Sequence, residues 1–232
     1  MLDHTKGTPM SLTDDLQAQA ARSVAAATPE VTAARRATVD AVVALGLADT
    51  AITVGDHAPE FVLPDVTGAP VRLSTLLETG PVVVSFYRGG WCPYCNIELH
   101  ALQEALPALT AAGGTLVAIS PDAPDDTLST AEKAGLEFAV LSDTTATAIT
   151  AFGLNFTVDS VTRVVLSEPD AKDARAQGVK TEVLPIPATY VIGTDGTVAY
   201  AFVDPTYTRR AEPAEIVAAV AVLTGRSADA SD

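Results

Sequence analysis

Hydrophobic and polar positions along most of the chain follow a pattern that predicts strands alternating with helices. Residues 81–87, Pro-Val-Val-Val-Ser-Phe-Tyr, form a continuous β-branched and aromatic run, typical of a strand buried on both faces. A helix over about 92–112 follows, and residues 115–120 give the next buried strand. The other predicted elements are strands over 60–63, 71–73 and 138–141, helices over 126–134 and 144–152, a hairpin of 189–192 with 198–202, and a helix over 213–223. This order predicts an α/β sandwich with a mixed sheet, and residues 155–184 show no regular pattern.

Two helices are expected before this α/β region. The segment 11–27 starts with Ser11 and carries Asp14 and Asp15 in its first turn, where acidic residues suit a helix N-terminus. Thr28-Pro29-Glu30 is a second start signal, and the amphipathic helix that it opens runs to Gly46. We therefore expect an N-terminal helical extension over 1–50, a main domain over 51–226 and a C-terminal tail over 227–232. The extension should pack on the main domain or on a second subunit, so the oligomeric state stays open, with a homodimer as one alternative.

Composition narrows the kinds of partner that the chain can have. Lys and Arg number 14 and Asp and Glu 29, so the formal net charge is −15. Phosphate backbones and anionic membranes bind clustered cations, so we expect neither a nucleic acid nor a membrane as a partner. Apolar residues make up 48% of the chain, but the longest apolar run, 216–223, is far shorter than the roughly 20 residues that span a bilayer. The N-terminus lacks the apolar stretch of a secretory signal, so we expect a cytoplasmic protein.

The two cysteines of the chain stand together, as Cys92-Pro93-Tyr94-Cys95. Cys92 comes where a helix begins after a buried strand, and the unpaired N–H groups and dipole of a helix start stabilise a thiolate. Cys95 lies about one turn further along the same face, within reach for a disulfide. The pair predicts dithiol–disulfide chemistry. The alternatives are two structural thiols, or half of a zinc site that would need two more ligands from His4, His57 and His100. We expect no metal and no cofactor, and we place His57 and His100 at the surface.

Five stretches carry a family resemblance, in family order: residues 54–61 (VGDHAPEF), 86–99 (FYRGGWCPYCNIEL), 118–122 (AISPD), 141–143 (LSD) and 187–192 (PATYVI). With them the chain resembles the peroxiredoxin-like branch of the alkyl hydroperoxide reductase/thiol-specific antioxidant (AhpC/TSA) family. The resemblance implies a three-layer α/β/α thioredoxin-like fold with a mixed sheet. It also implies reduction of hydrogen peroxide or alkyl hydroperoxides by a cysteine thiolate, with thioredoxin or a low-molecular-weight thiol as the reductant.

The expected site departs from the family pattern at three positions. The family carries Pro-x-x-x-Thr-x-x-Cys before the helix. Aligned on the shared Glu-Leu, its reacting cysteine falls on Cys95, its threonine on Cys92 and its proline on Arg88. The later arginine of the family falls on Pro187. The hydroxyl and guanidinium that would orient a peroxide are therefore missing from their usual positions. Arg88 is the nearest replacement cation, with a solvent-facing or ion-paired arginine as the alternative. Arg209 and Arg210 are more distant candidates, and for them we favour a solvated pair near a helix start.

The order of attack stays open at this point. In the peroxiredoxin register Cys95 attacks the peroxide, and Cys92 condenses with the sulfenic acid. In the thioredoxin register Cys92 attacks a disulfide, and Cys95 resolves the mixed disulfide. Helix-terminus electrostatics favour Cys92 as the thiolate, whereas the family alignment favours Cys95.

Four neighbouring residues complete the expected site. By resemblance, Pro187 is a cis proline that faces the cysteines and shapes the substrate groove. Trp91 and Tyr94 flank the thiols and should shape the rim of the site, with ordinary packing as the alternative. Glu98, one turn past Cys95, is either a proton shuttle or a surface or loop-bonding carboxylate.

The sequence therefore supports three functional hypotheses. The first is a thiol-dependent peroxidase that works through a dithiol–disulfide cycle. The second is a thioredoxin-like thiol–disulfide oxidoreductase that acts on protein disulfides. The third is a redox-sensing or interaction module whose N-terminal helices form the binding surface.

Overall fold

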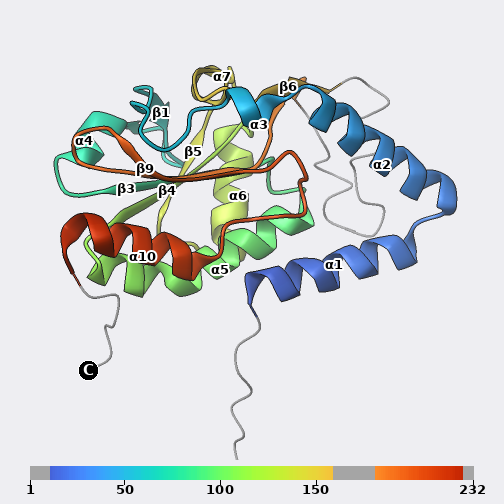
Figure 1. The fold of residues 1–232 in the computed structure, drawn as a ribbon, viewed down its shortest axis with the longest axis horizontal. Helices are drawn as coiled ribbons and strands as arrows, with labels where there is room; N and C mark the ends of the chain where they lie inside the picture. The colour runs from blue at the N-terminus through green and yellow to red at the C-terminus, as the bar shows by residue number, and fades with distance from the viewer. Residues whose placement is uncertain (1–10, 159–180, 227–232) are drawn as a thin grey trace, which may run out of the picture.

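A five-stranded mixed sheet forms the centre of the fold (Figure 1). The computed structural model describes residues 11–158 and 181–226. The strands of the central sheet are β3 Val82–Phe86, β4 Thr115–Ser120, β5 Ala139–Ser142, β8 Ala188–Ile192 and β9 Val198–Val203. They lie in the order β5-β4-β3-β8-β9, with β3, β4 and β5 parallel and with β8 antiparallel to both of its neighbours.

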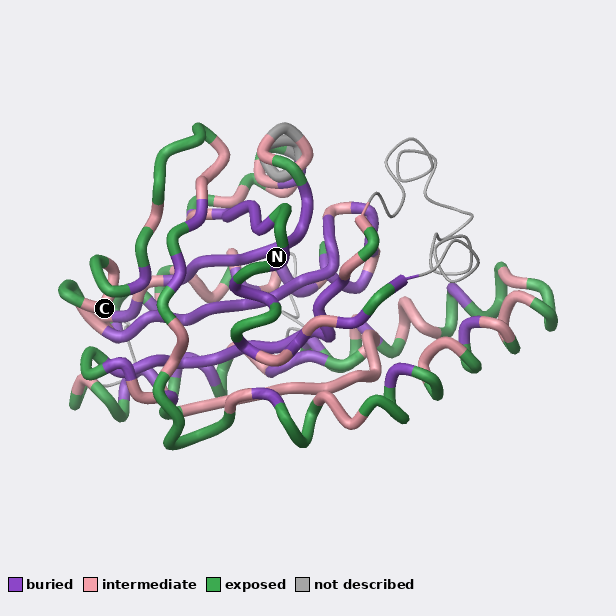
Figure 2. The backbone as a smooth tube through the Cα atoms, turned by 90° about the horizontal axis from the view of Figure 1, so that it is seen from above, coloured by how far each residue is buried: buried purple, intermediate pink, exposed green. Residues whose placement is uncertain are grey.

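Strand β3 lies at the middle of the sheet because its sequence permits burial on both faces. All five of its residues are buried, between β4 on one side and β8 on the other. β-Branched and aromatic side chains pack well on both faces of a pleated sheet. Figure 2 shows the strands of this sheet as largely buried segments, whereas the N-terminal helices alternate between buried and exposed positions. The end of β3 is therefore a firm support for the loop that follows it.

Helices and smaller strand pairs surround this sheet. Outside the sheet, the described elements from α4 onward are α4 Leu73–Leu77, α5 Pro93–Ala111, α6 Pro124–Ala134, α7 Thr147–Ala151, α10 Pro213–Thr224, and the strands β1 Val62–Pro64, β2 Pro70–Arg72, β6 Asn155–Thr157 and β7 Val183–Pro185. Helices α5 and α10 pack together on one face, and the β1–β2 pair and α7 lie on the other (Figure 1). The ring of Phe152, after α7, packs on Phe86 and Tyr190 with centroid distances of 4.8 and 5.3 Å. The expected three-layer, thioredoxin-like arrangement is confirmed.

Three helices precede the sheet: α1 Leu12–Ala26, α2 Pro29–Ala44 and α3 Leu47–Thr50. Helix α1 begins with a capping box, in which Ser11 and Asp14 each accept a hydrogen bond from the other's backbone N–H at 3.2 Å. Helix α1 packs on α5, and Thr13 donates from its backbone N–H (2.8 Å) and its hydroxyl to Glu212, just before α10. Figure 1 shows α2 running back from the end of α1 towards α3. The extension therefore packs on the α/β part of the same chain.

The structure contains elements that the sequence pattern did not predict. Gly46 adopts a φ of 65° and leads directly into α3. Helix α4 begins at Leu73, which we had expected to end a strand, and β6 pairs with β7 at the ends of the region expected to be irregular. The helix predicted over 144–152 is present as the shorter helix α7, Thr147–Ala151. The boundaries at 50 and 226 stay predictions, and the predicted tail over 227–232 lies outside the described residues.

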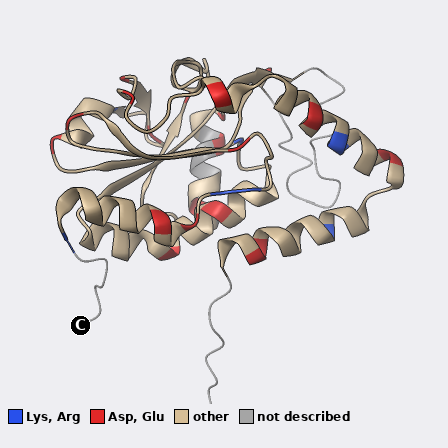
Figure 3. Ribbon diagram, viewed as in Figure 1, with Lys and Arg blue, Asp and Glu red and all other residues tan. Residues whose placement is uncertain are grey.

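Charge on the described part of the chain is mainly acidic. Figure 3 shows acidic positions spread over the helices and loops, and only a few basic positions. Within the described ranges, no helix has the length and apolar character that crossing a membrane requires.

Candidate active site

The loop between β3 and α5 brings the two cysteines to the edge of the sheet. Cys92 is the N-cap residue of α5, and Pro93 takes the first helical position. Gly89 has a φ of 135°, and a Cβ there would lie 2.5 Å from the Trp91 indole nitrogen, so the turn requires glycine. Asp122, just after β4, accepts a hydrogen bond of 2.9 Å from the Gly90 N–H. The loop is thus held by a carboxylate that the sequence did not single out.

The Cys95 thiol lies in a fully partnered polar cluster. The Arg210 Nη2 lies 3.2 Å from the Cys95 sulfur, and its Nε lies 2.5 Å from a Glu98 carboxylate oxygen. The Arg210 Nη1 donates to the backbone carbonyls of Tyr207 and Arg209, both at 2.7 Å. The Ser85 hydroxyl donates to the other Glu98 oxygen at 3.3 Å. Every nitrogen of the Arg210 guanidinium therefore has a partner, which fixes its position.

The Cys92 thiol lies beside a second, differently held arginine. The Arg88 Nη1 is 4.0 Å from the Cys92 sulfur. The guanidinium is stacked between two aromatic rings, 4.8 Å from the centre of Trp91 and 4.4 Å from that of Tyr207. Its Nε and Nη2 are buried and have no hydrogen-bond partner among the described residues. The aromatic faces hold the cation in place while two of its donor groups stay open.

Only one of the two thiols ionises readily. Burial opposes ionisation of Cys92, but the neighbouring Cys95 thiol and the charges of Arg88 and Arg210 outweigh it, and the pKa of Cys92 falls to about 6. Burial and the Cys92 thiolate raise the pKa of Cys95. Arg210 is closer to Cys95 than Arg88 is to Cys92, yet both arginines attract a charge on either sulfur. We place the thiolate on Cys92 because that sulfur stands at the helix N-terminus and accepts from the Cys95 S–H.

Glu98 is buried, with 1% of its surface exposed, so a surface position is wrong. Its carboxylate pairs with Arg210 in the loop before α10, as the loop-bonding alternative expects. Burial raises its pKa to about 7, although the attraction of Arg210 opposes the shift. Near neutral pH it can therefore both give and take a proton. A sequence signal was available: Cys95, Glu98, Leu99 and Leu102 recur at helical spacing, and all four are buried.

Arg210 is the main correction to the expected site. We had interpreted Arg209–Arg210 as a solvated pair, but only Arg209 is exposed, where it pairs with Asp204 at 3.0 Å. Arg210 is 5% exposed and reaches Cys95 from a position 115 residues further along the chain. The turn at Tyr207 supplies two of its acceptors, and no local pattern in the sequence marks this loop.

Three further expectations are corrected by the structure. Every described peptide bond is trans, so the cis form expected for Pro187 is wrong; its carbonyl accepts from the Asp204 N–H at 3.3 Å. Trp91 and Tyr94 are buried rather than placed at a rim: Trp91 packs on Arg88, and Tyr94 contacts α1. The Tyr94 hydroxyl donates to Ser23 on α1 at 3.3 Å. His57 and His100 are exposed, as expected.

A narrow crevice leads to the arginine beside Cys92. It has a volume of about 10 Å³, which is room for about one water molecule. Arg88 and Pro187 line it, together with Val39 and Val42 of α2 and with Tyr207. Neither cysteine lines the crevice, and both residues are at most 1% exposed, so the dithiol site is closed.

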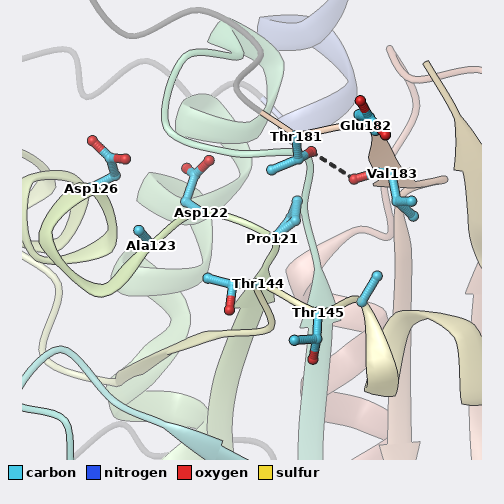
Figure 4. Close-up of a pocket in the computed structure, with 10 residues that line it drawn as sticks. Pro121, Asp122, Ala123, Asp126, Thr144, Thr145, Thr181, Glu182 and Val183 are labelled. Atoms are coloured by element: carbon cyan, nitrogen blue, oxygen red, sulfur yellow. Dashed lines mark hydrogen bonds between the residues drawn. The ribbon is translucent and has the colours of Figure 1, made fainter. Parts of the chain in front are cut away.

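A separate pocket of about 370 Å³ lies at the carboxyl ends of β4 and β5 (Figure 4). Neither cysteine lines it, and its walls carry three carboxylates, of Asp122, Asp126 and Glu182. In Figure 4 the Thr181 hydroxyl donates to the Val183 carbonyl, at 2.7 Å. Such an acidic lining repels anions, including thiolates, so the pocket is not part of the dithiol site.

A mixed sheet with a Cys-x-x-Cys pair at the start of the following helix defines a thioredoxin-fold redox protein. The sequence profile of the AhpC/TSA family matches residues 54–201. A relative in Mycobacterium tuberculosis H37Rv that carries the name peroxiredoxin is 32% identical over 152 residues, which is 66% of this chain and 85% of that protein. Peroxiredoxin Bcp of Escherichia coli K12 is 37% identical over 92 residues, 40% of this chain and 58% of that protein. The crystal structure of peroxidoxin BcpB from M. tuberculosis superposes with a TM-score of 0.58 and 28% identity, over 76% of this chain and 99% of that chain.

The chain belongs to the AhpC/TSA family. The expected class of activity, a thiol-dependent peroxidase of the peroxiredoxin type, is confirmed at this level. A peroxide substrate and a thiol reductant follow from that class.

Proposed function

We propose that the chain reduces hydroperoxides by a dithiol–disulfide cycle in which Cys92 attacks first and Cys95 resolves. The observation that carries this order is a crevice lined by Arg88, whose Nη1 lies 4.0 Å from the Cys92 sulfur. Cys95 has no exposed surface, and its sulfur is held by Arg210. Cys92 therefore carries the thiolate beside the arginine that lines the crevice.

The cycle balances with groups already in the site. The Cys92 thiolate attacks one peroxide oxygen, the O–O bond breaks, and the Cys95 thiol gives its proton to the leaving alkoxide. The resulting Cys95 thiolate attacks the sulfenic acid on Cys92, forming the disulfide. The hydroxide that leaves takes a proton from Glu98, whose pKa of about 7 suits this transfer. One hydroperoxide and two thiol groups thus yield one alcohol, one water and one disulfide.

In this proposal Arg88 and Arg210 have different roles. Arg88 directs two free N–H donors into the region where negative charge develops on the leaving oxygen. Arg210 positions Cys95 and Glu98 for the second step. Trp91 and Tyr207 hold the Arg88 side chain between their rings and keep water away from it.

Single cysteine variants test the order of attack. We expect Cys95→Ser to consume one equivalent of peroxide and to carry one sulfenic acid on Cys92, detected by a dimedone adduct and mass spectrometry. We expect Cys92→Ser to lose at least about 10²-fold in the rate of peroxide consumption. A rapid burst in Cys92→Ser would instead assign the attack to Cys95. Absence of reaction above the rate of a free thiol in both variants and in the wild type would refute the peroxidase itself.

The alternative of a protein disulfide oxidoreductase is less favoured by the burial of both sulfurs under α1 and α2. A large substrate would have to displace these helices before it reached Cys92. The same helices would also hinder a large reductant. We propose either thioredoxin or a low-molecular-weight thiol as the reductant. Reduction of insulin disulfides at a rate comparable to peroxide turnover would favour the alternative.

We also propose the cytoplasm as the compartment and a homodimer as the assembly. The dimer is supported by exposed apolar side chains on and just after the N-terminal helices, at Val24, Val43 and Leu45. Sizing chromatography of the wild type beside a Val24→Asp/Val43→Asp variant tests the assembly, because the charges should dissociate such an interface.

A further inference from the structure

Arg88 is a buried cation that has no carboxylate partner among the described residues. The residue is 2% exposed, and its Nε and Nη2 have no hydrogen-bond partner. A buried donor left unsatisfied is destabilising, and more so when it belongs to a charged group. Arg210, only a short distance away, has a partner for each nitrogen and a carboxylate as counter-ion. The open donors of Arg88 are therefore a candidate binding site for a group that accepts hydrogen bonds.

The charge that faces Arg88 depends on the state of the dithiol. In the reduced protein, the Cys92 thiolate lies beside the guanidinium and balances its charge. Formation of the Cys92–Cys95 disulfide removes that negative charge, while Arg88 stays charged at every physiological pH. The aromatic rings on both sides offer partial compensation only, because they carry no net charge.

The crevice limits the size of what can reach the open donors. Its volume of about 10 Å³ accommodates a group about as large as a water molecule. Its walls are mostly apolar, from Val39, Val42, Ile186 and Pro187, so an ion inside would be weakly screened and strongly attracted by the guanidinium. No carboxylate lines this crevice among the described residues.

We propose that Arg88 forms a binding site for a small monovalent anion of about halide size, filled when Cys92 carries no negative charge and above all in the disulfide form. The anion accepts from the Nε and Nη2 of Arg88 and takes the place of the thiolate as the counter-charge. Reduction of the disulfide regenerates the thiolate and expels the anion. This inference goes beyond the peroxidase cycle and holds for whichever sulfur attacks first.

Linkage then couples the anion to the redox equilibrium of the dithiol. A ligand that binds the disulfide form better than the reduced form must stabilise the disulfide. Above the dissociation constant, a tenfold rise in anion concentration should lower the equilibrium constant for reduction by up to tenfold. For a two-electron couple this is a shift of about 30 mV towards more negative potential.

Direct binding can be followed through the single tryptophan of the chain, Trp91, whose ring lies on the Arg88 guanidinium. Bromide serves as the probe because it is small and quenches indole fluorescence on contact. Bromide replaces gluconate at constant ionic strength, since gluconate is too large for the crevice. We expect saturable quenching in the oxidised protein, and a loss of at least tenfold in apparent affinity in the reduced protein at pH 8.

Two variants control this titration. Arg88→Gln removes the cation and should abolish saturable quenching. Arg209→Gln makes the same charge change at an exposed arginine and should leave the quenching unaltered. A Cys92→Ala/Cys95→Ala variant cannot form a thiolate, so it should bind bromide without any oxidation. That variant also keeps the proposal testable if Arg88→Gln does not fold.

The redox equilibrium supplies an independent readout. The fraction of disulfide is measured in a glutathione redox buffer at pH 7.5 while chloride replaces gluconate. The proposal is overturned if the oxidised wild type shows neither saturable quenching nor a chloride-dependent equilibrium. It is equally overturned if the Cys92→Ala/Cys95→Ala variant fails to bind bromide, or if Arg88→Gln shows the same chloride dependence as the wild type. These measurements use no peroxide, so their failure is distinguishable from failure of the peroxidase cycle.

Discussion

The two sides of the dithiol are built on opposite principles. On the Cys95 side, Arg210, Glu98 and Ser85 form a closed network in which every nitrogen of the arginine has a partner. On the Cys92 side, Arg88 is held by ring faces and leaves two donors open. A satisfied buried network fixes a structure, whereas open donors carry a cost that only a ligand or a developing charge removes. The first side therefore holds the site together, and the second side carries its reactivity.

The largest expected contrast is in stability, between Arg210→Met and Arg88→Met. Loss of Arg210 leaves the Glu98 carboxylate buried without its counter-ion, and we expect the free energy of unfolding to fall by about 3–5 kcal/mol. Loss of Arg88 removes a cation–π contact of about 0.5–2 kcal/mol and also the cost of two open donors, about 1–3 kcal/mol. These contributions nearly cancel, so we expect a change within about 1 kcal/mol, together with a large loss of peroxidase rate. Urea denaturation at pH 7 measures both variants.

A double variant, Arg210→Met/Glu98→Leu, serves as the control for this contrast. It removes both buried charges at once, and we expect it to recover most of the stability that Arg210→Met loses. Similar losses in Arg210→Met and Arg88→Met would contradict the division of the site into a structural and a reactive side.

The second prediction concerns the pH dependence of stability through Glu98. Its pKa is about 7 in the folded chain against an ordinary value of 4.5, so the folded state keeps a proton that the unfolded state has lost. The stabilisation of the protonated form is fully present below pH 4.5 and is lost as the pH rises through 7. The contribution is on the order of 3 kcal/mol in full. Glu98→Gln should remove this slope in urea denaturation between pH 5 and 8.

The Cys92 thiol contributes a slope of the opposite sign, because its pKa is lowered to about 6 from 9.0. Its stabilisation is present above pH 9 and is lost as the pH falls through 6. The comparison is therefore made in a Cys92→Ser background, where only the Glu98 slope should remain. Glu104→Gln, an exposed position on the same helix, is the matched control and should leave the slope unchanged. An unchanged slope in Glu98→Gln would show that Glu98 is already ionised at pH 5.

The two sides of the site also differ in how far the sequence could predict them. Arg88 and Cys92 are four residues apart on one loop, so the strand–helix pattern alone brought them together. Arg210 reaches Cys95 across 115 residues, because the β8–β9 hairpin returns the chain to the start of α5. Single-sequence patterns describe local periodicity and carry no direct signal for such a contact. The burial of Glu98 could have been predicted from the sequence, since Glu98 shares the buried face of α5 with Leu99 and Leu102.

The expectation for Pro187 failed for a related reason. The resemblance transferred a cis proline from a general fold to this position, whereas the peptide is trans in this chain. The sequence of strands and helices around it was nevertheless right, because buried β-branched runs at β3, β4 and β8 leave few other arrangements. The fold was therefore far more predictable than the partners of the two cysteines.

The smallest expected effect concerns the cover that α1 forms over both sides of the site. The Tyr94 hydroxyl donates to Ser23 of α1 at 3.3 Å, and the Tyr94 ring packs against that of Tyr207 at 5.4 Å. Tyr94→Phe and Ser23→Ala each remove this hydrogen bond, and we expect each to cost about 0.5–1 kcal/mol. If α1 must move before a thiol reagent reaches the sulfurs, this loss raises the rate of thiol labelling about two- to fivefold, because 1.4 kcal/mol corresponds to tenfold.

Labelling with Ellman's reagent under native conditions measures that rate. The matched control is Tyr200→Phe, which removes a hydroxyl that donates to Glu215 at 2.9 Å at an exposed position. It should leave labelling unchanged. The double variant Tyr94→Phe/Ser23→Ala should label no faster than Ser23→Ala alone, because Ser23→Ala already removes the bond from Tyr94 together with one that Ser23 accepts from Gln19. A loss of stability without faster labelling would mean that reagents enter through the crevice at Arg88, so that access depends on the Cys92 side alone.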